Sequence, residues 1–596
     1  MASITNNTSS AETSRRLETR SGILHLTTID SEFDVTRDIA LGPHCFIGRD
    51  EVFPEWQSLY FAEPFPDEPT MEITEKNLRG LVNHFLPSLA DNLNAYHGTS
   101  YSIDFWRILV LPWLIELVQK AWTSYVRLNQ IIDQYGDKPL TVKVCQDDFE
   151  WQFDGTVDFL NTMLSDYRFS WWIDSVVVAA LAPAGWLLLP SEPISHPVIE
   201  PPKEAPRWQA NNRYQTILRN IKYYLGYLDI PGLRWGGLFL AAYVNLLPKS
   251  PSRIRFSSDP DFHPEPYFPK IFLSELTRLM DATMPESFLD GFPALAQKAQ
   301  RFPNVSGRLR LGALSFWNEQ EKVMAAFALE AGEKRVIIQH GGEYGMLKYN
   351  MMFNEMEGKL CTFISWGWAY DEIDDICGHI VPMPSPLHSK LADQHKSRND
   401  SIICEGVGVR LLLDRIHWAF KVNSPVHCCN QSIEFLEKLD DRVRKSVIYR
   451  PYARAANDIE FSDTVRKRFP EMPMLEFNLH DAALKCRLVV LYSYSTTLNL
   501  SMAANIPTIV YLSPDLMAPR KEAEPFFEPL RRCGVIHDSP AAAAKHLNRI
   551  YDDIESWWNG SDVQEARKIW THQFARTDRF WWWQWLKALA KLRDIG

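Results

Sequence analysis

Residues 486–513 read CRLVVLYSYSTTLNLSMAANIPTIVYLS, and this stretch decides the fold class. An apolar run at 488–492 predicts a buried strand. A hydroxyl-rich turn and a helix at about 497–504 follow, and Pro507 opens a second apolar run. Strands that are apolar on both faces are typical of parallel sheets, because helices cover both sides of such sheets. A strand, a helix and a second strand in this order form a βαβ unit, so the stretch predicts an α/β fold.

The same alternation of short apolar runs with helical patterns extends over the second half of the chain, from residue 308 to about residue 570. The predicted strands that precede the opening stretch read RLRLGALSF, KRVIIQHGG, KLCTFISWGW, SIICEGVGV and SVIYRPYA. Apolar strands separated by helices indicate repeated βαβ units. We therefore expect a Rossmann-like region with a parallel sheet over residues 308–570.

The first half of the chain has a different pattern. Residues 1–22 are polar and rich in Ser and Thr, and they lack the apolar run of a secretory signal, so we expect a disordered tail. Early strands are expected within residues 23–48. A long helix is predicted from a Ser102 cap to Gly136, because apolar residues recur there at helical spacing. This helical region would form a large insertion in an N-terminal lobe.

Composition narrows the functional class. The chain has 596 residues, of which 46% are hydrophobic and 23% charged, the profile of a folded protein of several domains. A net charge of −11 argues against nucleic-acid binding, which needs a basic face. The nine cysteines form no CxxC pair, so neither a zinc site nor a disulfide framework is indicated. The most apolar window, 174–190, is interrupted by Pro183 and is too short to span a bilayer, so we expect a cytoplasmic protein.

The turn that follows the strand at 488–492 is the first candidate site. It carries hydroxyls at Ser493, Ser495, Thr496 and Thr497, just before a helix begins. Free backbone N–H groups, the helix dipole and hydroxyls at such a helix start favour an anion. An ordinary N-cap needs only one hydroxyl. The four together therefore predict a phosphate-binding turn.

Two other strand tips carry charged side chains. Arg450 ends the strand in SVIYRPYA, and a guanidinium at the carboxyl end of a parallel strand faces the ligand crevice and suits phosphate. Glu405 ends the strand in SIICEGVGV, beside two glycines that allow close ligand approach. Glu405 is a candidate for a ribose contact or for a base. A surface salt bridge for Arg450 and a plain turn for Glu405 are the alternatives.

A histidine and two glycines end the strand in KRVIIQHGG. His340 is left at the tip, and Gly341 and Gly342 permit a tight turn that exposes backbone N–H groups to a ligand. An imidazole in a crevice binds a phosphate or carries a proton near neutral pH. We expect the tips at His340, Arg450 and Thr497 to open on one crevice.

Two further features lie outside this expected crevice. Polar side chains gather at the start of the long helix, where His97 and Asp104 are candidates for a catalytic base in the N-terminal lobe. The C-terminal segment reads FWWWQWLKALAKL, which combines four tryptophans with lysines. Such a helix packs its aromatic side chains between domains, or it rests on a membrane surface. No cluster of metal ligands is recognisable.

Several of these motifs in combination resemble one family. The blocks that carry the resemblance are LGPHCFIG, LADNLNAYHGTSYSIDFWRILVLPWL, QHGGEYG, SWGW and YSYSTTLNLSMAANIPTIVYL. Together they resemble the LIC12162 family of transferases from bacterial surface-polysaccharide (O-antigen) gene clusters, over residues 23 to about 590. The last block also resembles the donor half of GT-B glycosyltransferases, and the His-Gly element resembles that of capsule Kdo transferases.

The resemblance implies an α/β, GT-B-like fold with two Rossmann-type lobes. Residues 23–307 would form the acceptor-side lobe, residues 308–570 the nucleotide-sugar lobe, and residues 571–596 a helix that crosses back to the N-terminal lobe. It also implies a metal-independent glycosyltransferase without a cofactor. A sugar, such as a CMP-activated Kdo or nonulosonic acid, would move from its nucleotide to a glycan or lipid-linked glycan acceptor at the inner face of the membrane.

Three alternatives remain open from the sequence. A CDP-polyol phosphotransferase and a sugar-nucleotide epimerase would use the same scaffold. A non-catalytic subunit that binds glycan would keep the fold without the chemistry. An epimerase needs no acceptor, and a binding subunit retains glycan affinity while it loses donor affinity, so donor-only product analysis and binding assays separate these cases.

Overall fold

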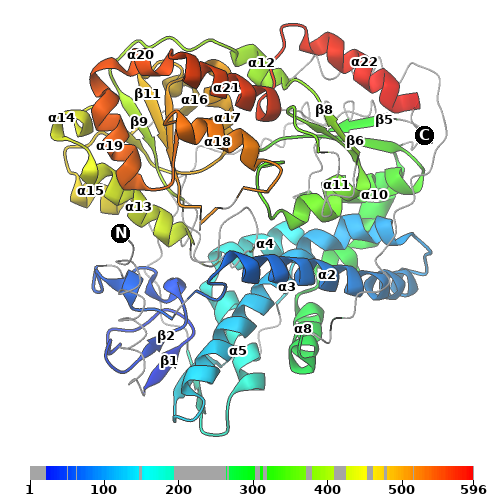
Figure 1. The fold of residues 1–596 in the computed structure, drawn as a ribbon. Coiled ribbons are helices and arrows are strands. Elements are labelled where there is room, and N and C mark those ends of the chain that lie inside the picture. Colours follow the sequence, from blue (N-terminus) through cyan, green and yellow to red (C-terminus); the bar gives the residue numbers. More distant parts are fainter. Residues whose placement is uncertain are drawn as a thin grey trace.

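The structure is a computed structural model, and it describes most of the chain between residues 22 and 594 (Figure 1). The described ranges are 22–49, 51–61, 63–146, 151–192, 264, 267–302, 309–312, 318–370, 379–408, 412, 416, 424–452, 461–475, 479–514, 516–517 and 519–594. The expected disordered tail lies outside them, apart from Gly22. Within these ranges the strands form three sheets, and every strand pair in them is parallel. The α/β class with parallel sheets is therefore confirmed.

The first sheet belongs to the N-terminal part of the chain. Its strands, in the order β2-β1-β3-β4, are β1 (Ile23–His25), β2 (Ile39–Ala40), β3 (Thr141–Cys145) and β4 (Leu187–Ser191). Strands therefore form where the sequence predicted early strands, at 23–48. Because β2 lies on one side of β1 and β3 on the other, the winding direction reverses between β1 and β3.

The second sheet has four strands in chain order: β5 (Leu309–Gly312), β6 (Lys334–Ile338), β7 (Thr362–Ser365) and β8 (His379–Pro382). The third sheet has the order β10-β9-β11-β12-β13, with β9 (Ile402–Glu405), β10 (Val447–Arg450), β11 (Leu488–Leu491), β12 (Thr508–Tyr511) and β13 (Ile536–His537). The expected nucleotide-sugar lobe, residues 308–570, thus contains two separate sheets.

The opening stretch forms the centre of the third sheet. β11 leads into helix α17 (Thr496–Ala504), which leads into β12, and β11 pairs in parallel with both β12 and β9. The βαβ unit predicted for residues 486–513 is confirmed. Numbered from β9, the strand order of this sheet is 2-1-3-4-5, so its winding direction reverses between β9 and β11. In open α/β sheets, ligands bind beyond the carboxyl ends of the strands at such a reversal.

Long helices connect the first two sheets. The predicted long helix is α3 (Ile103–Tyr135), with Ser102 as its N-cap and Gly136 at its end. It packs against α2 (Glu68–His97), against α5 (Tyr167–Leu181) beside the first sheet, and against α10 (Glu319–Glu330) beside the second. Figure 1 shows α2 and α3 crossing the molecule between β1 and α10. Among the residues that the structure describes, no helix combines the length and apolar character needed to cross a membrane.

The C-terminal helices join the third sheet to the second. Helix α21 (Ser561–Phe574) packs against α17 and α18 (Glu524–Arg532), and α22 (Trp581–Asp594) then covers one face of the β5–β8 sheet (Figure 1). The strands covered by α22 lie within residues 309–383, which the sequence analysis assigned to the nucleotide-sugar lobe. Arg576 fixes the crossing, because its N–H donates to Trp366 O and its carbonyl accepts from Ser385 N, both at 2.8 Å.

Candidate functional site

The carboxyl ends of β6 and β11 meet at one point. Gly342, four residues beyond the end of β6, lies so close to the start of α17 that a Cβ atom on it would be 2.3 Å from Thr496 N. Asn499 donates its side-chain N–H to Gly342 O at 3.2 Å. The contact needs a glycine for its close approach rather than for a special φ angle. The structure therefore brings together two of the expected tips, the His-Gly-Gly turn and the hydroxyl-rich turn.

A second pair of loops closes the same junction. Leu347, in the loop after β6, forms an antiparallel bridge with Pro519, in the loop after β12. The neighbouring Arg520 N–H donates to Met346 O at 2.8 Å. The loops that follow β6 and β12 are thus paired through their backbones, so the two sheets hold their carboxyl ends toward each other.

Glu405 and Thr497 face each other across the reversal of the third sheet. The Thr497 hydroxyl donates to Glu405 Oε1 at 3.2 Å, and Glu405 Oε2 is buried without a hydrogen-bond partner among the described residues. Burial raises the pKa of Glu405, Thr497 and Arg450 lower it, the charge of Glu343 adds a smaller rise, and the net value is about 7. A carboxyl group with a pKa near 7 can gain or lose a proton during turnover.

Arg450 lies beside Glu405 in the same sheet. The two residues occupy paired positions at the ends of β10 and β9, and the Arg450 charge acts on the pKa of Glu405. The Arg450 charge also lowers the pKa of His480, for which burial is the larger cause. The expected Arg450 tip therefore belongs to the same cluster as the hydroxyl-rich turn. Arg454 lies outside the described residues.

The hydroxyls of the turn have different surroundings. Ser495 is the N-cap of α17, and its side chain accepts from Thr497 N at 3.3 Å. Ser493 is buried, whereas Thr496 is half-buried at the first helical position. One hydroxyl is thus used in capping and one in the contact with Glu405. The phosphate-binding role of the four stays a prediction.

His340 is held by two side chains on its own side of the junction. The Tyr344 hydroxyl lies 3.0 Å from His340 Nε2, and Glu357 Oε1 lies 3.7 Å from His340 Nδ1. Glu357 is buried; burial raises its pKa, while the nearby His340 lowers it. Glu357 lies on a short π-helix (Phe353–Glu357), a geometry frequent at functional sites. Sequence reasoning missed Glu357, because neither periodicity nor a motif marks it.

Glu343 connects the histidine to the acid of the third sheet. Burial raises the pKa of Glu343, and its partner His340 lowers it, while the charge of Glu343 raises the pKa of Glu405. His340, Glu343 and Glu405 therefore interact electrostatically across the junction of two sheets. Sequence reasoning also missed Glu343, although its place directly after Gly341 and Gly342 was a usable signal.

Hydrogen bonds of the Gln339 side chain hold the turn around His340 in place. This buried amide accepts from Trp366 N at 2.8 Å and from Trp368 Nε1 at 2.9 Å, and it donates to Gly341 O at 2.8 Å. Gly345 has a φ of +76°, and a Cβ there would lie 2.3 Å from the Trp368 ring. These contacts pre-organise the tip without using the His340 side chain.

The two candidate bases of the N-terminal lobe lie in other surroundings. His97 Nε2 lies 2.8 Å from Phe288 O, and its ring stacks on Trp106. Asp104 accepts from Arg107 Nε at 3.2 Å, and Arg107 in turn contacts Glu355. These contacts of both side chains serve the packing of α2 and α3, and the catalytic role of His97 and Asp104 stays a prediction.

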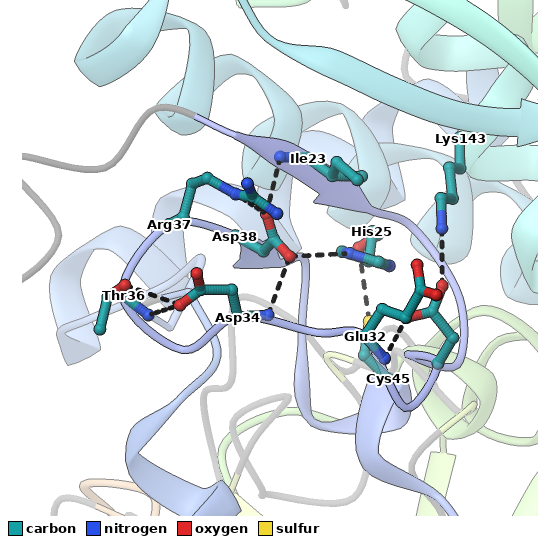
Figure 2. A network of polar contacts seen from close by, with 10 residues as sticks. Ile23, His25, Glu32, Asp34, Thr36, Arg37, Asp38, Cys45 and Lys143 are labelled. Carbon is teal, nitrogen blue, oxygen red and sulfur yellow. Dashed lines mark hydrogen bonds and ion pairs between the residues drawn. The ribbon is translucent and has the colours of Figure 1, made fainter.

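A separate polar network surrounds β1 and the segment that joins it to β2 (Figure 2). The Asp38 carboxylate accepts from Ile23 N and Asp34 N and lies 3.8 Å from His25 Nε2. Although burial opposes it, these contacts lower the pKa of Asp38. A cavity of about 140 Å³ adjoins the network; its lining residues are His25, Leu26, Thr27, Thr28, Asp30, Lys143, Trp171, Ser191 and Glu192. The network fixes the connection between β1 and β2.

Comparison with known protein families matches nearly the whole chain to one family. The family model described as LIC12162 family transferase matches residues 23–589. The chain belongs to the LIC12162 family. A search of curated proteins finds no match. Membership of the LIC12162 family makes the protein a member of a transferase family, and the match includes His340, Glu405, Arg450 and Thr497.

Proposed function

We propose that this LIC12162 family protein transfers a sugar from a nucleotide donor to a surface-polysaccharide or O-antigen acceptor. One observation carries the proposal: the His340-Gly341-Gly342 turn of the second sheet lies directly on the start of α17 in the third sheet. Strand tips of two parallel sheets thereby meet where the third sheet reverses its winding. That place combines an anion-binding helix start with titratable side chains.

In this proposal the second and third sheets act as the two Rossmann-type lobes of a GT-B-like enzyme. Their carboxyl ends face each other, and the C-terminal helix crosses from the third sheet to the second. The residues before 309 would then form an additional unit on the acceptor side. No cofactor or metal enters the proposed reaction.

The donor phosphate would lie at the start of α17. Free N–H groups and the helix dipole favour an anion there, together with Ser493, Ser495 and Thr496. Arg450 would supply the positive charge. Glu405 occupies the same place with a pKa of about 7, so it must be protonated when a phosphate binds beside it. A protonated Glu405 donates a hydrogen bond to the phosphate or to a ribose hydroxyl, and it adds no repulsion.

The reaction forms a bond between an acceptor oxygen and the anomeric carbon, and it breaks the bond between that carbon and the phosphate oxygen. The phosphate leaves with the electron pair, and the acceptor hydroxyl loses its proton to a base. We assign this proton to Glu343, because it is only partly buried, its pKa is raised, and its charge interacts with both His340 and Glu405. Asp104 and His97 already have other partners.

The donor is expected to be a CMP-activated acidic sugar such as Kdo or a nonulosonic acid. Thermal shift against CMP, CDP, UDP, GDP and dTDP tests the nucleotide, because a ligand that binds only the folded state raises the melting temperature. The matching sugar nucleotide is then incubated with and without a glycan acceptor. Nucleotide release that depends on the acceptor supports the transferase; a changed sugar without an acceptor indicates an epimerase; and no nucleotide binding contradicts the proposal.

A further inference from the structure

The aromatic side chains of the C-terminal segment divide between two faces of α22. Trp581 and Trp585 turn inward with Leu589 and Leu592, and this face packs on β5, β6, β7 and β8. Trp585 is 1% exposed, and its indole N–H donates to Pro384 O at 2.8 Å. Packing on the second sheet therefore explains Trp581 and Trp585, and it does not explain the other two tryptophans of this helix, Trp582 and Trp583.

The other face points away from the molecule. Phe580 is 58% exposed, and the adjacent Trp582 and Trp583 are each 49% exposed. Figure 1 shows α22 at the edge of the molecule, beyond the second sheet. Large aromatic side chains grouped on one exposed surface indicate a site of interaction with a partner or a membrane.

Cations accompany these exposed rings. Lys587 Nζ lies 5.0 Å from the centre of the Trp583 ring, and the Arg579 guanidinium lies 5.6 Å from the centre of the Phe580 ring. Lys587 and Lys591 follow Trp583 at intervals of four residues, so all three lie along one face of the helix, and both lysines are exposed. Asp578, which precedes α22, accepts hydrogen bonds from Phe580 N and from the Gln584 side chain.

We propose that this outward face of α22 rests on an anionic lipid surface. Indole rings are amphipathic and settle at the headgroup level of a bilayer, while lysines on the same face pair with lipid phosphates. The whole chain carries a net charge of −11 and is repelled by an anionic membrane, so the local cations of α22 determine which face approaches. The proposal rests on the exposed face alone and is independent of the sugar chemistry.

Sedimentation with vesicles tests the proposal on the full-length protein. The two vesicle types are phosphatidylcholine alone and an equimolar mixture of phosphatidylcholine and phosphatidylglycerol. Binding to the mixed vesicles is expected, and it should weaken as salt is added, because salt screens the lysines from the lipid phosphates. Wild-type protein that remains unbound to the mixed vesicles at low salt overturns the proposal, and a protein partner would then be the occupant of this face.

Two variants and a matched control locate the contact. Trp582→Ser with Trp583→Ser should lower vesicle affinity by at least about tenfold. Lys587→Glu with Lys591→Glu should lower it by roughly 30-fold or more. Lys76→Glu with Lys545→Glu makes the same charge change at two other exposed positions and should bind as the wild type does. Equal loss in the control, or no loss in the tryptophan variant at an unchanged melting temperature, contradicts the proposal.

Discussion

Thr497 donates its hydroxyl hydrogen to Glu405 at 3.2 Å, across the point where the third sheet reverses its winding. The hydrogen bond joins the start of α17, which favours an anion, to a buried acid whose pKa is raised to about 7. An ionised Glu405 would repel a phosphate bound beside it, and a protonated Glu405 would not. Protonation of Glu405 and phosphate binding are therefore linked.

The first prediction concerns the pH dependence of nucleotide binding. Because a bound phosphate favours protonated Glu405, affinity should fall roughly tenfold between about pH 7 and about pH 8.5, where a nucleotide phosphate is already fully ionised. Calorimetry with the nucleotide found by thermal shift measures this change. Glu405→Gln is neutral at every pH and should bind equally at both. Equal affinity of the wild type at the two pH values would disprove the linkage.

The same raised pKa predicts a change in folding stability. Glu405 holds its proton in the folded state up to about pH 7, whereas the unfolded carboxyl releases it near its ordinary value. Stability should therefore decrease as pH rises through the interval between these two values and stay low above it. Glu405→Gln should remove this decrease, so chemical denaturation at about pH 6 and about pH 8 should give closer midpoints for the variant than for the wild type. Parallel changes in both proteins would assign the effect to other groups.

The close approach of Gly342 to α17 gives a prediction with an internal control. A Cβ at Gly342 would meet Thr496 N at 2.3 Å, and because the obstructing atoms are backbone, the junction must move apart. Gly342→Ala should cost about 1–3 kcal/mol of stability and weaken nucleotide binding. Gly185→Ala places a Cβ where nothing lies within 4 Å and should change neither. Thermal melts and calorimetry compare the two variants, and a fully stable Gly342→Ala would contradict this contact.

Periodicity and strand tips were sufficient to predict part of this site. The βαβ pattern located β11, α17 and β12, and the rule for the carboxyl ends of parallel strands brought Glu405 and Arg450 to one edge, since both end neighbouring strands. The contact between Gly342 and Thr496 also follows the expected convergence of tips. Each of these features depends on neighbouring residues or on the parallel pairing of strands, so it could be predicted from the sequence.

The remaining features depend on which distant segments pack together. The predicted strands that became β7 and β9 are both short apolar runs, and nothing in the sequence places them in different sheets. Glu355 and Glu357 are two residues apart on a π-helix, yet Glu355 contacts Arg107 and Glu357 faces His340. Residues two apart on a helix point to different sides, but the period alone does not show which distant side chain each of them meets.

The pairing of His340 with Glu357 predicts non-additive variants. If Glu357 acts by holding His340, then His340→Ala, Glu357→Gln and the double variant should lose transfer to a similar extent, because each removes the same unit. Glu355→Gln is the matched control on the same π-helix; it removes the negative charge that pairs with Arg107, so it should lower the melting temperature and leave transfer largely intact. If the double variant loses as much transfer activity as the two single losses combined, His340 and Glu357 act independently and the prediction is wrong.

The assignment of the acceptor proton to Glu343 is tested against its rivals in the N-terminal lobe. Glu343→Gln keeps the shape of the side chain and removes the base, so turnover should fall by about 10²- to 10⁴-fold. Nucleotide affinity should change little when it is compared at about pH 6, where Glu405 keeps its proton. Asp104→Asn and His97→Asn should disturb only the packing contacts with Arg107 and Phe288. Steady-state kinetics with saturating donor distinguishes these cases, because loss of a base lowers kcat rather than donor binding. If turnover instead falls in Asp104→Asn and persists in Glu343→Gln, the acceptor proton is taken on the α3 side of the molecule.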